Sequence, residues 1–224
     1  MNQEQWSAVD RYLNHLLVPP DPALEAALQA STAAGLPAIN VAPNQGKLLH
    51  LFARMQGARR ILEIGTLGGY STIWLARALP ADGKIVTLEL EPRHAEVARG
   101  NFARAGLGAL IDLRVGPALA LLPVLAGEGL DPFDFVFIDA DKASIAEYFT
   151  WALRLSRPGA VIIVDNVIRQ GAVIDAMSQD PSVQGVRRFN ELLAATPNAD
   201  ATTLQTVGSK GYDGFTLVRV TGGN

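Results

Sequence analysis

Two apolar segments of the sequence end abruptly in side chains that can bind a metal ion. FVFIDADK, residues 135–142, ends in Asp139, Asp141 and Lys142, and VIIVDN, residues 161–166, ends in Asp165 and Asn166. Carboxylate and amide oxygens suit Mg²⁺, Mn²⁺ or Ca²⁺ rather than zinc or copper. If the two segments are neighbouring strands, about 4.8 Å apart, Asp139, Asp165 and Asn166 form one candidate metal site. The alternative is that these acids only cap the helices that follow them.

The lysine that follows Asp139 by three residues is a candidate general base. Arginine is the usual cation of this chain, and lysine occurs only at Lys47, Lys84, Lys142 and Lys210. A lysine beside a divalent cation can accept a proton from a bound substrate. The alternative is that Lys142 is a solvated residue at the start of a helix.

A glycine-containing turn, EIGTLGGYS, follows the first apolar strand-like segment. It is not the dinucleotide fingerprint G-x-G-x-x-G, because Leu67 occupies the position of the second glycine. Glu63, Gly65 and Gly69 instead suit a nucleoside ligand without a pyrophosphate. Glu89 ends the second strand-like segment, where an acid can accept hydrogen bonds from ribose hydroxyls. An adenosine with a cationic amino-acid tail, which describes S-adenosylmethionine, fits this combination.

The elements that must position these residues alternate between strand and helix. Short β-branched segments cover residues 59–65, 83–91, 110–116, 133–141 and 159–166, and helical patterns cover 70–79, 92–105, 117–125, 143–155 and 181–195. Such alternation predicts βαβ units on a parallel sheet. Residues 202–220 are expected to form an antiparallel hairpin around an Asp-Gly turn. The fold class is therefore a doubly wound, Rossmann-like α/β sheet of seven mostly parallel strands, with helices before it.

Ligands of such sheets bind beyond the carboxyl ends of the strands. Four of the five parallel strands are expected to end in an acid, at Glu63, Glu89, Asp139 and Asp165. We expect one domain, residues 1–224. Its N-terminal helical segment, 1–57, would pack on a sheet region, 58–224.

The composition excludes several classes of protein. Of 224 residues, 49% are hydrophobic and 18% charged, the net charge is −3, and no basic stripe is present, so nucleic acid and anionic membranes are not expected partners. Cysteine is absent, which excludes disulfides and thiolate sites. No signal peptide or membrane-spanning run is expected, so the predicted location is cytoplasmic. No catalytic or metal-binding histidine group is expected, because the histidines are assigned to packing or the surface; they are His15, His50 and His94.

Segments spanning residues 39–218 resemble one enzyme family, the cation-dependent O-methyltransferases that use S-adenosylmethionine. This group includes the catechol and caffeoyl-CoA O-methyltransferases, and the similarity is to its bacterial members. The segments are INVAPNQGKLL, ILEIGTLGGYS, GKIVTLELEP, VGPALALLP, FDFVFIDADK, VIIVDNVIRQGAV and GSKGYDGFTL. The resemblance implies metal ligands at Asp139, Asp165 and Asn166, and catalytic roles for Lys142, as the base, and Asp139. The implied cofactor contacts are Val41, Glu63, Gly65, Thr66, Ser71, Glu89, Ala118 and Asp139.

The function implied by the resemblance is methyl transfer to a hydroxyl of a small vicinal-dihydroxy aromatic, by a homodimer that uses Mg²⁺, with Mn²⁺ or Ca²⁺ as alternatives. The substrate is expected to contact residues 167–182, the helix around Trp6 to Tyr12, and Tyr212. A nicotinamide-dependent oxidoreductase is one alternative, and Leu67 argues against it. A non-catalytic cofactor-binding scaffold is another, and the set of Asp139, Lys142, Asp165 and Asn166 argues against that.

Overall fold

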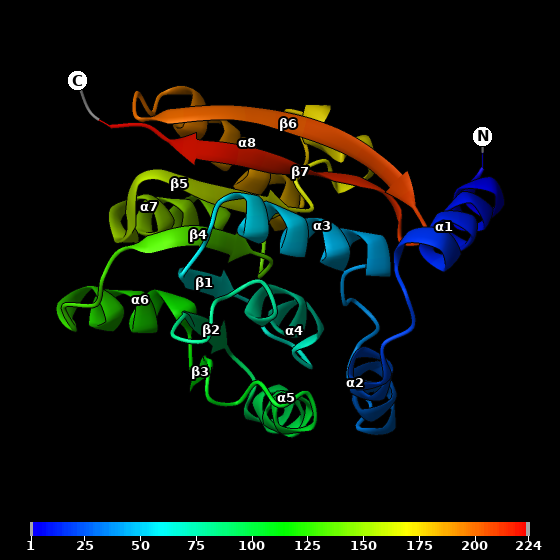
Figure 1. Ribbon diagram of the computed structural model, residues 1–224. Helices are drawn as coiled ribbons and strands as arrows, with labels where there is room; N and C mark the ends of the chain where they lie inside the picture. The colour runs from blue at the N-terminus through cyan, green and yellow to red at the C-terminus, as the bar shows by residue number, and fades with distance from the viewer. Residues whose placement is uncertain (1, 223–224) are drawn as a thin grey trace.

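A seven-stranded mixed sheet forms the centre of the protein in a computed structural model that describes residues 2–222 (Figure 1). The strand order is β3-β2-β1-β4-β5-β7-β6, with β1 to β5 parallel and β7 antiparallel to both of its neighbours. The expected fold class is thereby confirmed. The strands are β1 Arg60–Ile64, β2 Lys84–Glu89, β3 Ile111–Val115, β4 Phe133–Ile138, β5 Ser156–Asp165, β6 Ala199–Gly208 and β7 Gly211–Val220.

The register of the sheet aligns the carboxyl ends of its central strands. Ile64 pairs with Leu88 and with Ile138, and Ile138 pairs with Val164. The residues that follow this row, Gly65, Glu89, Asp139 and Asp165, therefore form one rim. Glu63, which the sequence placed at a strand tip, is one residue too early for the rim. Side chains alternate between the faces of a sheet, so Glu63 points to the face that carries Phe137 rather than into the rim.

Helices cover both faces of the sheet and enclose two apolar layers. One layer contains Leu62, Val136 and Phe149 and lies under α6, α7 and α8; the other contains Ile61, Phe135 and Phe137 and lies under α2 to α5. The helices are α1 Gln3–Leu17, α2 Pro22–Ala33, α3 Pro43–Met55, α4 Tyr70–Ala76, α5 Pro92–Arg104, α6 Ala118–Gly127, α7 Ile145–Leu155 and α8 Pro181–Ala194, with a 3₁₀ segment, η1, at Arg169–Ile174.

The C-terminal hairpin has its turn four residues before the predicted position. Gly208 pairs with Gly211, so the turn is Ser209–Lys210, and Asp213 and Gly214 lie inside β7. The Asp-Gly turn prediction is therefore wrong, for a steric reason. A Cβ on Gly214 would lie 2.1 Å from the Leu204 carbonyl oxygen, so glycine is required here for close packing rather than for a turn.

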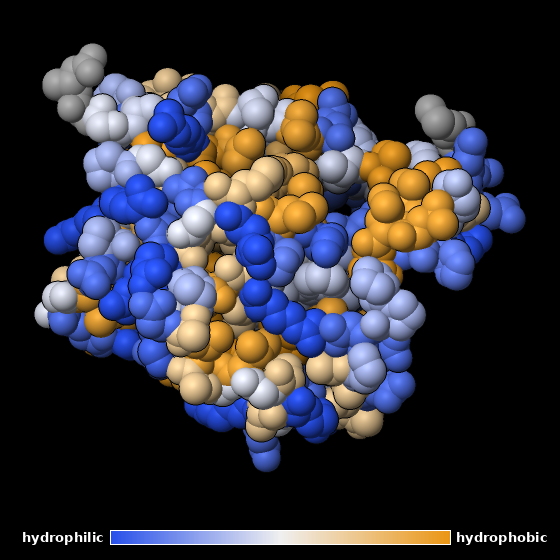
Figure 2. All heavy atoms as spheres, in the orientation of Figure 1, coloured by the Kyte–Doolittle hydropathy of each residue, from blue (hydrophilic) through white to orange (hydrophobic). Residues whose placement is uncertain are grey.

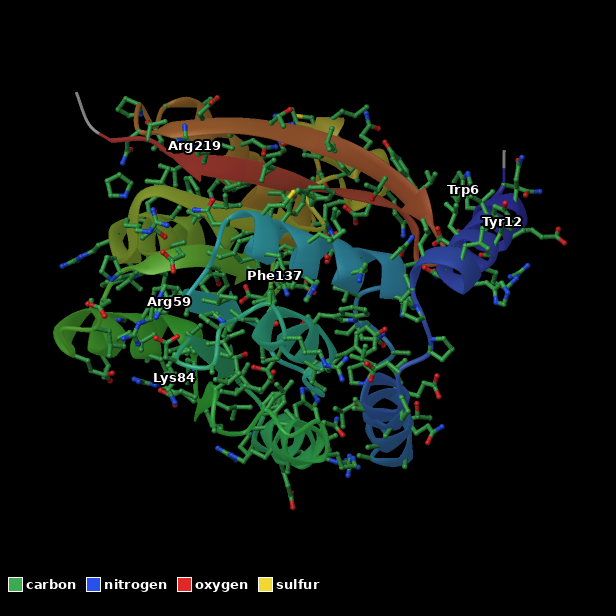
Figure 3. All side chains as sticks on the ribbon, viewed as in Figure 1. Trp6, Tyr12, Arg59, Lys84, Phe137 and Arg219 are labelled. Carbon is green, nitrogen blue, oxygen red and sulfur yellow. The ribbon has the colours of Figure 1, made fainter. Side chains whose placement is uncertain are left out.

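The N-terminal helix α1 lies at the tip of this hairpin (Figure 1). Gln3 Nε2 donates to the Gly208 carbonyl at 2.9 Å, and Asp10 Oδ2 accepts from the Ser209 amide at 2.6 Å. Trp6 and Tyr12 project from this helix at the edge of the molecule (Figure 3). Within residues 2–222, no helix combines the length and the apolar character that crossing a membrane requires.

Candidate active site

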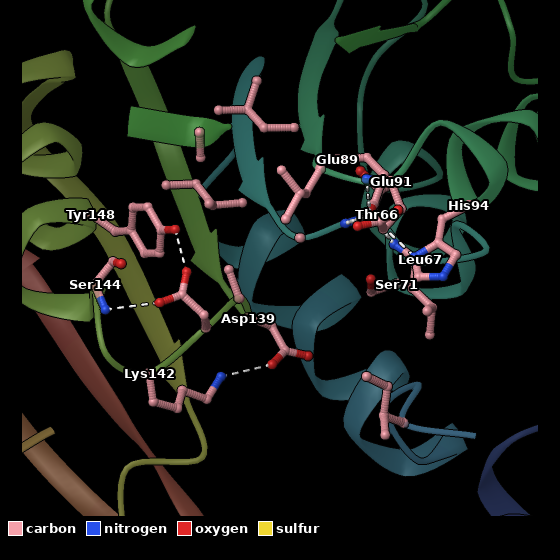
Figure 4. A pocket seen from close by; sticks show the side chains of 18 of the residues that line it. Thr66, Leu67, Ser71, Glu89, Glu91, His94, Asp139, Lys142, Ser144 and Tyr148 are labelled. Carbon is pink, nitrogen blue, oxygen red and sulfur yellow. Dashed lines mark hydrogen bonds and ion pairs between the residues drawn. The ribbon is translucent and has the colours of Figure 1, made fainter. Parts of the chain in front are cut away.

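A cavity of about 720 Å³ lies beyond the carboxyl ends of the parallel strands (Figure 4). Its wall includes most of the residues expected at the site: Val41, Gly65, Thr66, Ser71, Glu89, Ala118, Asp139, Lys142 and Asn166. Of the segments expected to meet the substrate, residues 167–182 contribute Arg169 and Ser182. Among the described residues, those around Trp6 to Tyr12 and Tyr212 do not line this cavity.

Glu89 fixes the first turn of the fold. Its Oε2 accepts from the amides of Thr66 at 3.1 Å and Leu67 at 2.7 Å, and its Oε1 accepts from the Glu91 amide at 3.0 Å. Leu67 has a φ of 51°, a left-handed conformation that non-glycine residues adopt at a cost. The carboxylate of Glu89 therefore holds a strained turn in place while it faces the cavity.

His94 also lines the cavity, which corrects its assignment to packing or the surface. Its Nδ1 lies 3.2 Å from Glu89 Oε1. The sequence signal was its position five residues after Glu89, at the start of α5, where a helix turns its first side chains back towards the preceding strand end.

Glu63 is not among the described residues that line the cavity. It supports the site from the layer beneath the cavity wall. Its side chain is fully buried and accepts hydrogen bonds from Ser71 at 2.7 Å, Thr72 at 2.5 Å and Thr87 at 2.6 Å. Burial raises its pKa to about 7, against the lowering effect of these hydrogen bonds. Glu63 thus joins α4 to β1 and β2, and its direct contact with a cofactor stays a prediction.

Lys142 is buried rather than solvated. Only 7% of its side chain is exposed, and its Nζ lies 3.0 Å from Asp139 Oδ1 (Figure 4). The helix-capping alternative applies to Asp141, which accepts from the Ser144 amide at 2.9 Å and from the Tyr148 hydroxyl. Asp139 is not used in this way, and its carboxylate faces the cavity beside Lys142.

Asp165 lies behind the described residues that line the cavity, and only 4% of it is exposed. Its Oδ2 accepts from Gln45 Nε2 at 2.7 Å, and its Oδ1 accepts from the Asn166 amide at 2.9 Å. Burial, and then the negative charge of Asp139, raise the pKa of Asp165 to about 7. Gln45, from α3, was not predicted as a site residue, although it lies in the segment INVAPNQGKLL.

The expected metal ligands have the chemistry of a site for a hard cation. Asp139 and Asp165 follow paired positions of β4 and β5, and the charge of one disfavours ionisation of the other. A divalent cation would relieve this repulsion. Within residues 2–222 no three His, Cys, Asp or Glu side chains form a potential metal site. The candidate ligand set has only two such side chains, the carboxylates of Asp139 and Asp165, and its third member is the amide of Asn166. This oxygen set fits Mg²⁺, Mn²⁺ or Ca²⁺.

Comparison with known proteins assigns the family. The model of a family described as O-methyltransferase matches residues 20–221. The chain belongs to the O-methyltransferase family. It is 54% identical to a catechol O-methyltransferase of Niastella koreensis, covering 98% of this chain and 100% of that one. It is 55% identical to a catechol O-methyltransferase of Mycobacterium tuberculosis, covering 95% and 94%.

Solved structures of O-methyltransferases have the same fold. An enzyme from Bacillus cereus in complex with SAH has a TM-score of 0.97 and 57% identity, covering 98% of this chain and 100% of that one. The O-methyltransferase TomG from Streptomyces achromogenes, in complex with SAM, has a TM-score of 0.96 and 58% identity, covering 99% and 100%. The predicted enzyme class, an O-methyltransferase dependent on S-adenosylmethionine, is confirmed. The oxidoreductase and scaffold alternatives are rejected.

Proposed function

We propose that this O-methyltransferase transfers the methyl group of S-adenosylmethionine to one hydroxyl of a small vicinal-dihydroxy aromatic, with Mg²⁺ as the expected cation and Mn²⁺ or Ca²⁺ as alternatives. The observation that carries the proposal is the cluster of Asp139, Asp165 and Asn166 beside Lys142 at the ends of β4 and β5. Two adjacent oxygens on one ring are the substrate group that a single cation can hold. The names of the catechol O-methyltransferases to which the chain is similar agree with this substrate class.

The cofactor would occupy the side of the cavity that Glu89 lines. Val41, Gly65, Thr66, Ser71 and Ala118 are on its wall, and Gly65 approaches β4 so closely that a Cβ would lie 2.0 Å from the Asp139 carbonyl oxygen. The carboxylate of Glu89 would accept a ribose hydroxyl, although three backbone amides already use most of its capacity as an acceptor. The bound SAH and SAM of the two similar structures support this assignment.

The reaction needs a proton acceptor, and Lys142 is the residue we assign to it. When bound, a divalent cation supplies Lewis-acid stabilisation of negative charge on oxygen. Lys142 would take up the hydroxyl proton, and Asp139, 3.0 Å away, would stabilise the ammonium that results. Gln45 would keep Asp165 oriented through its hydrogen bond. The fixed ends of β1, β4 and β5 would hold acceptor and donor in line, which supplies much of the rate.

A panel of catechols tests the proposal. The purified enzyme is dialysed against EDTA and given S-adenosylmethionine and catechol, flavonoid or hydroxycinnamate substrates, with product detected by mass spectrometry. We expect a mass gain of one methyl group with Mg²⁺ and no turnover in EDTA. Full turnover in EDTA would contradict the cation requirement, and methylation of monophenols at the same rate would contradict the vicinal-dihydroxy substrate.

We further propose a cytoplasmic homodimer in which α1 contributes to the contact. Val9, Leu13, Leu16 and Leu17 are exposed on this helix, by between 39% and 66%, where Figure 2 shows apolar side chains gathered at the edge of the molecule. Val9, Leu13 and Leu16 recur at the spacing of one helix face. A stripe of this kind is typical of a helix that another chain covers.

A further inference from the structure

Arg169 is a cavity-lining cation whose guanidinium donors have no hydrogen-bond acceptor among the described residues. Its Nε is buried without a hydrogen-bond partner, although 31% of the side chain as a whole is exposed. The nearest acid is Asp213, whose Oδ2 lies 3.8 Å from Arg169 Nη1. This distance allows an ion pair but exceeds that of a hydrogen bond. A buried donor without an acceptor is costly, so a group is expected to reach it when the cavity is filled.

The backbone holds Arg169 in this position at a conformational cost. Arg169 and Gln170 have φ values of 54° and 56°, two consecutive non-glycine residues in the left-handed region. Asp213 Oδ1 accepts from the amides of Ile168 at 2.9 Å and Arg169 at 3.1 Å, which ties this segment to β7. Asp213 thus positions the arginine, and its second oxygen attracts the guanidinium without satisfying its donors.

The other charged groups near Arg169 in the cavity already have partners. Lys142 pairs with Asp139, and Asp141 accepts from Tyr148 and the Ser144 amide. An anionic substituent on the substrate would therefore find its counter-charge at Arg169, whose ion pair with Asp213 is too long to satisfy the guanidinium donors. The guanidinium presents planar, parallel donors whose geometry matches a carboxylate.

We propose that Arg169 binds a carboxylate carried by the aromatic substrate, so that the enzyme prefers catechols with an acidic substituent to neutral ones. This inference rests on the proposed function, because it assumes a vicinal-dihydroxy aromatic in the cavity. The inference adds to the proposed function that the substrate carries a negative charge. It assigns substrate specificity to a residue outside the proposed metal and cofactor contacts.

The test compares 3,4-dihydroxybenzoate with 3,4-dihydroxybenzamide, whose ring substituent is also electron-withdrawing but neutral. We expect the wild-type enzyme to have at least a tenfold higher kcat/KM for the acid, mainly through KM. Arg169→Gln should reduce this acid-to-amide ratio at least tenfold, and Arg169→Lys should retain part of it, because one charge remains without the planar fork. Arg99→Gln, the same charge change at an exposed position of α5, is the control and should leave the ratio unchanged.

Each contrary outcome has a distinct meaning. Equal kcat/KM values of the wild-type enzyme for the acid and the amide would overturn the inference and leave the proposed function standing. A loss in Arg169→Gln that is equal for both substrates would show a structural role and would also overturn it. Methylation of neither compound would overturn the proposed function and the inference together.

Discussion

Glu63 and Asp165 are both buried acids whose pKa is raised to about 7, but their surroundings differ. Three hydroxyl groups donate to Glu63, and these hydrogen bonds offset part of the effect of burial on its pKa. Asp165 carries, after burial, the repulsion of Asp139 as its next largest effect. A cation at the rim would relieve the repulsion at Asp165, whereas Glu63 has its own neutral partners and serves to join α4 to the sheet.

Glu63 makes stability depend on pH. Its pKa is about 7 in the folded chain and near 4.5 in the unfolded one, so between these values only the unfolded chain releases the proton. The free energy of unfolding therefore falls as pH rises from about 4.5 to about 7 and is then constant. We predict that Glu63→Gln, which has no such proton, lacks this fall, which amounts to about 3 to 4 kcal/mol at ~1.4 kcal/mol per pKa unit.

The measurement is denaturant unfolding of wild type and Glu63→Gln at pH 5 and pH 8, in EDTA so that no cation contributes. The free energy of unfolding of Glu63→Gln minus that of wild type should be more positive at pH 8 than at pH 5. A difference between the two proteins that is the same at both pH values would show that Glu63 does not retain its proton.

Replacing Lys142 and replacing Asp165 should lower the rate of the enzyme in ways that different conditions restore. Asp165→Ala removes an expected ligand, so the rate should fall and excess Mg²⁺ should partly restore it. Lys142→Met retains the three oxygen ligands and removes the proton acceptor, a loss of about 10²–10⁴-fold. Its rate should recover in part at high pH, where the substrate hydroxyl ionises into solvent.

Steady-state rates over a Mg²⁺ series and a pH series separate the two variants. Normal turnover of Lys142→Met at pH 7 would remove Lys142 as the base. A rate loss in this variant that Mg²⁺ alone corrects would assign Lys142 to support of the metal site.

At the level of elements, the periodicity of the sequence predicted the parallel strands and their helices, which local patterns determine. It missed the position of the hairpin turn, which close packing determines. The alternation of β-branched and helical segments gave the five parallel strands and their helices, because each segment buries a face of its own. The hairpin turn was misplaced because Asp213-Gly214 has the composition of a turn, whereas contacts with Ile168, Arg169 and Leu204 fix it inside β7. Only the three-dimensional packing contains that information.

Helix α8 reaches the site through a glycine. A Cβ on Gly185 would lie 1.9 Å from the Lys142 carbonyl oxygen, so the helix packs directly on the backbone that carries the proposed base. We predict that Gly185→Ala displaces this backbone, destabilises the protein by more than about 1 kcal/mol and lowers kcat. Thermal unfolding and kinetics at saturating Mg²⁺ measure both effects.

Gly100, inside α5, is the matched control. A Cβ there meets no atom closer than 3.9 Å, at the end of the Arg104 side chain. Gly100→Ala should therefore stabilise the protein by up to about 1 kcal/mol through helix propensity, with kcat unchanged. Equal effects of the two substitutions would show that the contact between α8 and Lys142 is not tight.

At the scale of the whole molecule, the site is a consequence of topology. The sequence identified the acids, and the parallel sheet brings Glu89, Asp139 and Asp165 to one rim, as expected. The sequence did not identify the side chains of distant elements that hold the site residues in position. Gln45 comes from α3, 120 positions before Asp165, and Asp213 holds Arg169 from β7. Neither contact has a sequence spacing that local patterns could identify.

At the same scale, α1 is the surface that we propose for a second copy of the chain. The helix is held to the hairpin tip by Gln3 and Asp10, and Val9, Leu13 and Leu16 form an exposed apolar stripe on it at helical spacing. We predict a wild-type particle of twice 23.8 kDa by size-exclusion chromatography with light scattering. A double variant, Leu13→Glu with Leu16→Glu, should shift it to the monomer, because two carboxylates would be desolvated at the contact.

Arg11→Glu is the control for the double variant, since it changes the net charge by the same amount at an exposed position of α1 on another side of the helix. It should remain dimeric, and circular dichroism should show that both variants keep the helical content of wild type. Dissociation by Arg11→Glu as well would indicate a general charge effect rather than an apolar contact. A wild-type protein that is monomeric at 50 times the concentration of the activity assay would contradict the dimer itself, and α1 would then be free to contact another partner.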